Sequence, residues 1–393
     1  MQIIHFILCL ALAILATPVF ILLLQVIASL FFKQASATYH AQYFPQVAVL
    51  IPAHNESLVI TQTLQALLPQ LKSADQLIVV ADNCSDDTAL ISRSLGATVL
   101  ERSNETLRGK GYALDYGLQH LKSHSPEVVI IVDADCIISA NAIEQLSKAC
   151  LAEKRPTQAL YLMLAQPNPS IKSRVAAFAW LVKNKVRPLG FKAMGLPCQL
   201  MGTGMAFLWT DISQINLANG HIVEDMKLGV DFARANKAPI FLPDALVTST
   251  FPPSQAATNT QRTRWEHGHL SVILTELPSL LLEAIKHQNL QMLGLACDLL
   301  VPPLAVLALL LMAMLSLSFL ATYLLADTLF LNASIALCVF FSAAIILAWF
   351  KYGRHIISFK QLCYAPIYAL LKLPLYIQFF INRQVEWVRS KRD

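Results

Sequence analysis

The sequence predicts an α/β domain with a mostly parallel sheet, held between transmembrane helices at both ends. Only 14% of the 393 residues are charged, against about 25% in soluble domains. This deficit is concentrated at the two ends of the chain, in long apolar runs. In the middle, short apolar runs alternate with helical segments, which is the pattern of a parallel α/β sheet.

The first 32 residues contain no Asp, Glu, Lys or Arg, and a membrane-spanning helix needs only roughly 20 apolar residues. A cleaved signal peptide is the competing interpretation, but it begins with positive charge, and Met1–Phe6 contains no Lys or Arg. We therefore expect an uncleaved anchor over residues 1–33. The positive-inside rule puts Lys33 on the cytoplasmic side.

Two further apolar runs, Met292–Ala326 and Leu329–Phe350, flank a short turn at Asp327. They predict a transmembrane hairpin over 292–350, which returns to the cytoplasmic side at Lys351. The next apolar run, Leu362–Ile381, contains two prolines and a lysine. We expect it to lie in the membrane interface within a final region, 351–393, that ends in a basic tail. A fourth span is the alternative.

The net charge of +5 suits an anionic membrane face or phosphate substrates. It is too small and too scattered to indicate a nucleic-acid partner. The eight cysteines include no CxxC pair, so we expect reduced thiols rather than a disulfide framework or a zinc site.

Polar loops follow the predicted strands of the middle region, which are Val47–Ile51, Leu77–Val80, Ala97–Leu100 and Val128–Val132. Helices are expected over Leu58–Leu71, Ala89–Leu95 and Met226–Ala235. In parallel sheets, ligands bind at the carboxyl ends of the strands. The polar residues at those ends are therefore candidate site residues: Pro52, Asn55 and Glu56 after the first strand, Asp82 after the second, and Asp133 and Asp135 after the fourth.

Asp133 and Asp135 carry the clearest chemistry. Two aspartates two apart on extended chain point the same way, and Mg²⁺ is bound in proteins by one or two carboxylates together with substrate phosphates. We therefore expect a Mg²⁺ or Mn²⁺ site here, bridging a diphosphate. Lys110 follows a glycine, but the segment lacks the pattern of an ATP-binding P-loop. It is either a diphosphate contact or a solvated basic loop.

Three later motifs complete the pattern. Gly202-Thr203-Gly204 allows close approach of the backbone to a ligand, or is simply a tight turn before a strand. Glu224-Asp225 opens a helix, where acids are favoured by the helix dipole in any case. Gln261-Arg262-Thr263-Arg264-Trp265 places a guanidinium, which can grip a diphosphate, beside an aromatic face. His267 and His269 follow, and we expect them to pack rather than to bind metal.

The order of these motifs resembles the membrane-bound branch of the family-2 glycosyltransferases, with its D, D, D, QxxRW pattern. Cellulose, chitin and hyaluronan synthases and ceramide glucosyltransferase belong to that branch. The resemblance covers about Gln46–Trp265 and implies a GT-A nucleotide-sugar-binding domain. Many members have two acids where this chain has Ala81 and Asp82.

The resemblance also implies roles for the residues. Asp82 reads the base, and the other donor contacts are Pro52, Asn55, Glu56, Lys110 and Asp133. Asp135 is the more direct metal ligand, next to Asp133. Asp225 is the general base, with Glu224 beside it, and Arg264 holds the diphosphate. The acceptor and diphosphate gate comprises Gly202, Thr203, Gly204, Gln261, Arg264 and Trp265.

The function expected is an inverting transfer from a nucleotide-diphosphate sugar, with UDP as the expected nucleotide, to a lipid or lipid-linked saccharide. The catalytic domain is expected over 34–255, on the cytoplasmic face of a bacterial inner membrane, with an interfacial segment over 256–291. The product would be a glycolipid or an exopolysaccharide. A processive polysaccharide synthase with assembly partners is the alternative, and a non-catalytic nucleotide-sugar sensor or scaffold is the alternative of another class. The sequence leaves the donor sugar, the acceptor and the oligomeric state open.

Overall fold

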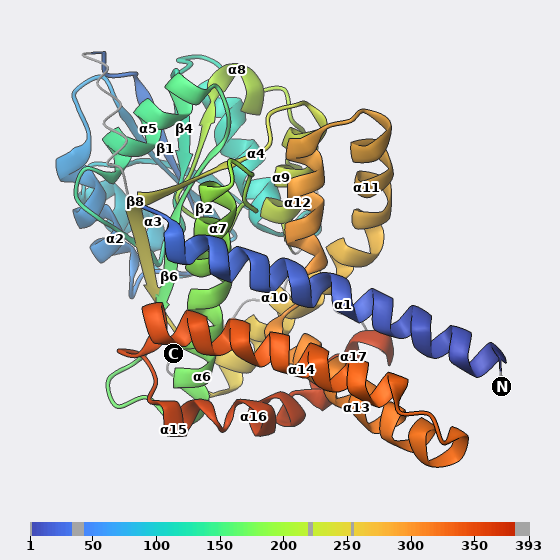
Figure 1. Cartoon of the computed structure of the whole chain (residues 1–393). Coiled ribbons are helices and arrows are strands. Elements are labelled where there is room, and N and C mark those ends of the chain that lie inside the picture. Colours follow the sequence, from blue (N-terminus) through green and yellow to red (C-terminus); the bar gives the residue numbers. More distant parts are fainter. Residues whose placement is uncertain (1, 34–42, 219–222, 253–254, 382–393) are drawn as a thin grey trace. The chain divides into compact units, whose positions relative to one another are not determined.

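The computed structural model describes residues 2–33, 43–218, 223–252 and 255–381 (Figure 1). The basic tail lies outside these residues. The chain divides into two compact units. Of the described residues, 43–164 and 197–268 form a sheet unit, and 2–33, 165–196 and 269–381 form a helical unit. Each unit is described here by itself.

The sheet unit is built on one eight-stranded sheet in the order β3-β2-β1-β4-β7-β6-β8-β5. The first four of these strands pair in parallel, as do β6 and β8, whereas β7 and β5 run antiparallel to their neighbours. The sheet is therefore mostly parallel, as the sequence predicts. The strands are β1 Val47–Ala53, β2 Gln76–Asp82, β3 Thr98–Arg102, β4 Val128–Ile131, β5 Ile137–Ile138, β6 Thr157–Leu164, β7 Met205–Leu208 and β8 Ile240–Thr250.

The central strands are apolar throughout and almost fully buried, because helices cover both faces of a parallel sheet. Alternate residues of β1, β2, β4 and β7 form one core cluster with α4 and α9, whereas α5 packs on β4, β6, β7 and β8. The helices of this unit are α2 Ile60–Leu67, a 3₁₀ turn Leu68–Gln70, α3 Thr88–Ser94, α4 Lys110–Leu121, α5 Ala142–Glu153, α8 Trp209–Ile212 and α9 Glu224–Arg234. The helix α10, Gln255–Thr275, has residues in both units.

The four predicted strands are all present, each within two residues of its expected ends. Their carboxyl ends share one edge of the sheet, because β1 pairs in parallel with both β2 and β4, and β2 with β3. The edge therefore collects Ala53, Asp82 and Arg102 from the strand ends and Asp133 from the turn after β4. The candidate site is built on this edge.

The helical unit consists of apolar helices, several of them broken. They are α1 Gln2–Phe31, α6 Ile171–Leu181, a π-helix Val182–Val186, α7 Arg187–Ala193, α11 Leu277–Lys286, α12 Leu290–Leu300, α13 Leu304–Leu325, α14 Leu329–Ala348, a π-helix Trp349–Gly353, α15 Phe359–Leu362, α16 Ala365–Leu371 and α17 Leu373–Ile381. The first C-terminal apolar run is not one helix as expected. It breaks between Leu300 and Leu304, where two consecutive prolines end α12 and begin α13.

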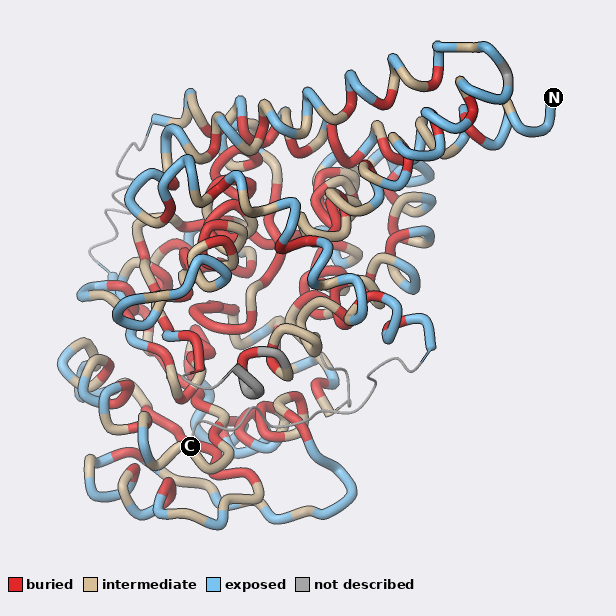
Figure 2. Tube along the Cα trace, turned by 90° about the horizontal axis from the view of Figure 1, so that it is seen from below, coloured by how far each residue is buried: buried red, intermediate tan, exposed pale blue. Residues whose placement is uncertain are grey.

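Four helices in the described residues are long and apolar enough to cross a membrane: Gln2–Phe31, Leu304–Leu324, Leu329–Gly353 and Phe359–Ile381. A bent pair, Thr260–Thr275 with Leu277–Lys286, would make a fifth. The segment expected to lie in the interface thus also meets the length and composition of a span. From Leu15 to Ser29 of α1, buried residues recur every three or four positions between exposed apolar ones, and Figure 2 colours buried and exposed residues differently. An exposed apolar face of this length suits lipid rather than water.

Within the helical unit, α1 and α14 run in the same direction. Near the start of α1, His5 Nε2 lies 3.5 Å from Asp327 Oδ2 in the turn before α14. At the other end, Lys351 Nζ and Tyr352 Oη each donate a 2.6 Å hydrogen bond to the carbonyls of Leu30 and Ser29. The ends expected to share a side of the membrane are therefore paired: the N-terminus with the acidic turn, and the end of α1 with the basic exit.

Candidate active site

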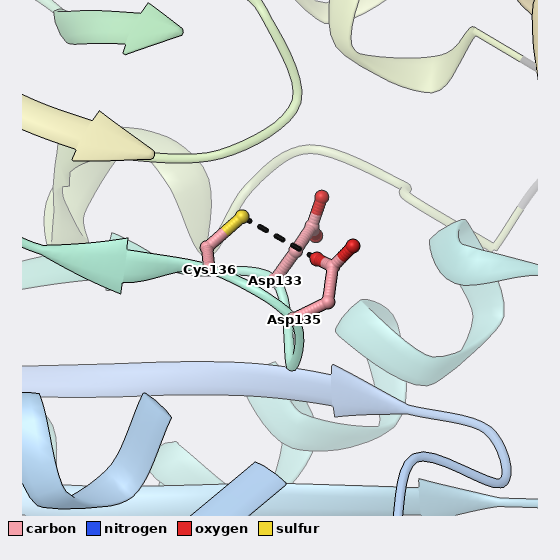
Figure 3. A group of neighbouring side chains, drawn as sticks. All are labelled: Asp133, Asp135 and Cys136. Atoms are coloured by element: carbon pink, nitrogen blue, oxygen red, sulfur yellow. Dashed lines mark hydrogen bonds between the residues drawn. The ribbon is translucent and has the colours of Figure 1, made fainter. Parts of the chain in front are cut away.

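Asp133 and Asp135 leave the turn after β4 with their carboxylates on the same side (Figure 3). One ligand atom from each, together with Cys136 Sγ, falls within 4.8 Å of the others, and this is the metal-ligand group found among the described residues. The turn is held from several sides. Thr203 Oγ1 accepts the Asp133 N–H at 3.0 Å, Ser249 Oγ donates to Asp135 Oδ2 at 3.2 Å, and the Cys136 thiol donates to Asp135 Oδ1 at 3.4 Å.

The two carboxylates of this group suit a hard divalent cation. Burial, and after it the charge of Asp133, raise the pKa of the Cys136 thiol above its usual value. The carboxylate oxygens are the hard donors of the group. That is the ligand chemistry Mg²⁺ and Mn²⁺ prefer.

Lys110 lies between the aspartates after β4 and the acidic residue Glu224. It is the first residue of α4 and follows Gly109. The φ of Gly109 is 127°, a value that residue types other than glycine rarely adopt. Lys110 Nζ lies 2.6 Å from Asp133 Oδ1 and 3.6 Å from Glu224 Oε1, and it donates to the Gly202 carbonyl at 2.7 Å. Burial opposes its charge, but Asp133 and Glu224 outweigh burial and raise the pKa of Lys110. The ammonium is therefore held charged among acids.

The buried side chain of Gln158, on β6, forms hydrogen bonds to the backbone at and next to the Gly202-Thr203-Gly204 segment. Its amide donates to the Thr203 carbonyl at 2.9 Å and accepts the Met201 N–H at 2.8 Å. Gly202 has a φ of 91°, and a Cβ there would lie 3.3 Å from Asp225 Oδ2. The glycine therefore lets the backbone approach the carboxylate predicted to be the base.

Glu224 and Asp225 form the first turn of α9, which begins two residues before the expected helix Met226–Ala235. Asp225 Oδ1 accepts the Met226 N–H at 2.8 Å, so the residue also serves the helix end, where a negative charge is favoured. The structural role and the proposed catalytic one are both compatible with this geometry. Asp225 lies close to Lys110 and to the glycine segment.

The last motif meets the same cluster through α10. A Cβ at Gly268 would lie 2.3 Å from Val223, next to Glu224, so only a glycine allows this contact. Arg264 interacts electrostatically with Glu224, Asp133 and Asp225, whereas Arg262 lies over the Phe251 ring, 5.3 Å from its centroid. The two arginines of one motif thus face different surroundings.

The motif also contains Gln261 and Trp265, and two histidines follow it. Gln261 is buried, and its Oε1 accepts no hydrogen bond from the described residues. Trp265 is half-buried. His267 and His269 are both buried, and a packing role for them stays a prediction.

A second cluster lies farther along the same sheet edge. Asp82 Oδ1 pairs with Arg102 Nη1 at 2.5 Å and accepts from Asn83 Nδ2 at 3.1 Å. The Asn55 amide oxygen accepts the Ser85 N–H at 2.7 Å, and the Glu56 N–H donates to Thr88 Oγ1 at 2.8 Å. Pro52 belongs to β1 itself.

Sequence reasoning missed three of these contacts: Arg102 beside Asp82, Cys136 beside the aspartates, and Ser249 behind them. Arg102 could have been found, because it ends a strand predicted to lie in the same sheet. Ser249 lies on β8, 114 residues beyond Asp135, and no local pattern indicates it.

A family model described as "Glycosyltransferase like family 2" matches residues 45–268. A probable glycosyltransferase of Bacillus subtilis, YdaM, is 27% identical over 248 residues, covering 58% of this chain and 56% of that protein. The 4,4'-diaponeurosporenoate glycosyltransferase of Staphylococcus aureus is 33% identical over 104 residues, covering 25% and 27%. The chain therefore spans about half or less of these relatives' lengths.

Among solved structures, the chain is similar to the mannosyltransferase PcManGT of Pyrobaculum calidifontis, described in complex with GDP-Man and Mn²⁺. The TM-score is 0.54 at 16% identity, covering 93% of this chain and 98% of that one. This likeness concerns the fold, which is of the GT-A type. Since the family model covers more than half of the residues, the chain belongs to the glycosyltransferase-like family 2.

Proposed function

We propose that the protein is a membrane-bound inverting glycosyltransferase that moves a sugar from a nucleoside diphosphate to a lipid or lipid-linked saccharide. The observation that carries this proposal is the acidic cluster at the sheet edge, where Asp133, Glu224 and Asp225 surround Lys110 and act on Arg264. Such a site offers ligands for a cation, contacts for a diphosphate and a carboxylate for the acceptor.

The donor is proposed to lie along the sheet edge. Asp82 and Arg102 provide an acceptor and donors of hydrogen bonds for the base, with UDP as the expected nucleotide. Asn55, Glu56 and the Pro52 backbone border the same loop and are the proposed ribose contacts. From there the diphosphate would extend toward Asp133, in the turn after β4, and toward Lys110, the first residue of α4. The strand β4 pairs in parallel with β1.

Asp135 and Asp133 are the proposed ligands of Mg²⁺ or Mn²⁺, because their oxygens are the charged donors of the metal-ligand group. A cation bound there supplies positive charge that offsets the negative charge of the diphosphate leaving group. The PcManGT complex contains Mn²⁺ and a nucleotide sugar, which is consistent with this assignment.

In the proposed reaction, the Asp225 carboxylate accepts the proton of the acceptor hydroxyl. The hydroxyl oxygen forms a bond to the anomeric carbon, and the bond from that carbon to the diphosphate oxygen breaks on the opposite face. The configuration is inverted, and a nucleoside diphosphate leaves. Glu224 and Lys110 are charged neighbours of Asp225. The Arg264 guanidinium binds the departing diphosphate.

The acceptor is proposed to approach over Gly202-Thr203-Gly204, with Gln261 and Trp265 at its border. Gln261 Oε1 is buried and accepts no hydrogen bond from the described residues. A lipid acceptor fits the four helices of the described residues that are long and apolar enough to cross a membrane.

We further propose that the catalytic domain faces the cytoplasm, in a bacterial inner membrane. The basic residues Lys33 and Lys351 follow the paired ends of α1 and α14, and basic residues favour the cytoplasmic side. In a background without native thiols, an external thiol reagent should label Asp327→Cys and spare Lys351→Cys. Labelling of position 351 alone would contradict this orientation.

The function is tested by giving the purified full-length protein, in native lipids, a panel of nucleotide sugars and analysing the lipids by mass spectrometry. One added hexose on a lipid with release of nucleoside diphosphate supports the proposal. A ladder of added sugars indicates a processive polysaccharide synthase instead. Nucleotide binding with no product from any donor would favour a sensor or scaffold.

A further inference from the structure

Lys110 occupies the position where the metal-binding and proton-accepting halves of the site meet. Its ammonium bonds to Asp133 Oδ1 at 2.6 Å and to the Gly202 carbonyl at 2.7 Å, with Glu224 Oε1 at 3.6 Å and Asp225 close by. Only 17% of the side chain is exposed. A cation that neutralises Asp133 is therefore part of the protein.

A divalent cation at Asp133 and Asp135 would meet this ammonium at close range. Both would share the Asp133 carboxylate, and like charges a few ångströms apart in a half-buried site repel strongly. The bare metal therefore competes with Lys110 for the same oxygen atoms, and the competition weakens its binding.

A diphosphate removes this competition. The lysine ammonium is a mobile point charge on a flexible four-carbon stem and readily binds phosphate oxygens. When a diphosphate enters, the ammonium can move from Asp133 to the phosphates and leave the carboxylate to the metal. Because coupling between two ligands is reciprocal, the metal in turn strengthens diphosphate binding.

We propose that Lys110 is an internal counter-cation that occupies the metal site of the free enzyme and makes divalent-cation binding conditional on the nucleotide diphosphate. This inference rests on the proposed function, because it takes Asp133 and Asp135 as metal ligands. It assigns Lys110 a role in the nucleotide-free state, in addition to contacting the donor.

The test measures Mn²⁺ binding by electron paramagnetic resonance of the full-length protein in detergent, without nucleotide and then with UDP, with GDP in parallel. Lys110→Met keeps the length of the stem and removes the charge. It should bind Mn²⁺ alone roughly tenfold or more tightly than wild type, and UDP should increase its Mn²⁺ affinity less than it does for wild type. Unchanged or weaker binding of Mn²⁺ alone overturns the inference.

Lys237→Met is the matched control. Lys237 Nζ pairs with Asp211 Oδ1, also at 2.6 Å, but neither residue belongs to the site, so Mn²⁺ binding should stay at the wild-type value. Removing Lys110 leaves several acids uncompensated, so Lys110→Met should melt at a lower temperature than wild type and recover with Mn²⁺. A loss of stability that Mn²⁺ does not restore, in Lys110→Met and in Lys110→Gln alike, counts against the inference.

Asp135→Asn separates this inference from the proposed function. If the variant binds Mn²⁺ and UDP together as wild type does, the metal site is misassigned and the proposed function loses its support. If it loses that binding while Lys110→Met shows no gain for Mn²⁺ alone, the metal site stands and only the role of Lys110 is wrong.

Discussion

Each unit of the protein contains a group of buried or half-buried charges, and the two groups differ in their charge balance. In the helical unit, Arg187 pairs with Asp298 at 2.8 Å, and the Gln25 amide donates to Asp298 at 2.6 Å and accepts from Arg187 Nε at 3.2 Å. One positive charge meets one negative charge. Arg187 and Asp298 are paired with each other, and their side chains are only 3% and 6% exposed.

The acidic site of the sheet unit gathers four carboxylates, those of Asp133, Asp135, Glu224 and Asp225. Lys110 and Arg264 interact electrostatically with three of them, Asp133, Glu224 and Asp225. The side chains remain half-buried rather than sealed. A satisfied buried network fixes a structure, whereas carboxylates gathered at one site disfavour one another's charge, and a bound cation would relieve this repulsion. From this comparison we expect a structural role for the first group and a binding role for the second.

Removing the metal should have the largest effect. With a chelator, or in Asp135→Asn, we expect sugar transfer to fall on the order of 10³-fold, because the leaving group loses several kcal/mol of charge stabilisation. The measurement is product formation by mass spectrometry, with Mg²⁺ or Mn²⁺ added back as the control for chelation. Full activity in chelator would show that the excess of acids serves another purpose.

Asp225→Asn tests the proton acceptor while keeping the shape of the side chain. Turnover should fall about 10²-fold or more, the usual contribution of a general base, and donor binding should stay near wild type. Asp231→Asn, on the exposed side of the same helix and paired with Lys227, is the control. Unchanged turnover in Asp225→Asn would mean that the base has been misplaced.

The two arginines of α10 offer a matched pair of smaller changes. Arg264→Lys should lower turnover roughly tenfold or more, because lysine keeps the charge but cannot form two parallel hydrogen bonds to a diphosphate. Arg262→Lys should be mild, since Arg262 lies over Phe251. Equal effects of the two substitutions on turnover would show that Arg264 contributes charge alone.

In the helical unit, the same kind of substitution should change stability and not chemistry. Arg187→Met leaves Asp298 buried without its cation and should cost about 3–5 kcal/mol, whereas Arg187→Met with Asp298→Leu should recover most of that loss. Thermal melting in one detergent compares the variants. If the double variant is as unstable as the single one and also loses turnover below its melting temperature, the group is not merely structural.

The sheet edge could be predicted from sequence because its signals are local. Apolar runs such as Val47–Ile51 predict buried strands, and parallel pairing brings the residues after them to one edge. The two charge groups differ in this respect. Asp133 and Asp135 are neighbours in the sequence, whereas Gln25 and Asp298 are 273 residues apart and each sits in an otherwise apolar run.

The break between α12 and α13 has a signal in the sequence, but the apolar composition around it outweighed that signal. Two consecutive prolines after Val301 mark the helix break that separates α12 from α13, yet the apolar composition predicted one continuous run. The surroundings of Lys110 could not be predicted, because they are made by residues far away in the sequence. The sequence left open whether Lys110 contacts a diphosphate or lies in a solvated basic loop, and only the structure brings Lys110 to Asp133, Gly202 and Glu224 at once.

The central claim is that the excess of acids at the sheet edge binds a divalent cation together with a nucleotide diphosphate. The most direct test is a crystal structure of the full chain with UDP and Mn²⁺, with anomalous diffraction collected at the manganese edge. We predict one strong anomalous peak in contact with Asp135, with Asp133 and the diphosphate beside it and the Lys110 ammonium withdrawn from Asp133. Bound UDP with no peak at these aspartates, or a peak elsewhere, would contradict the claim.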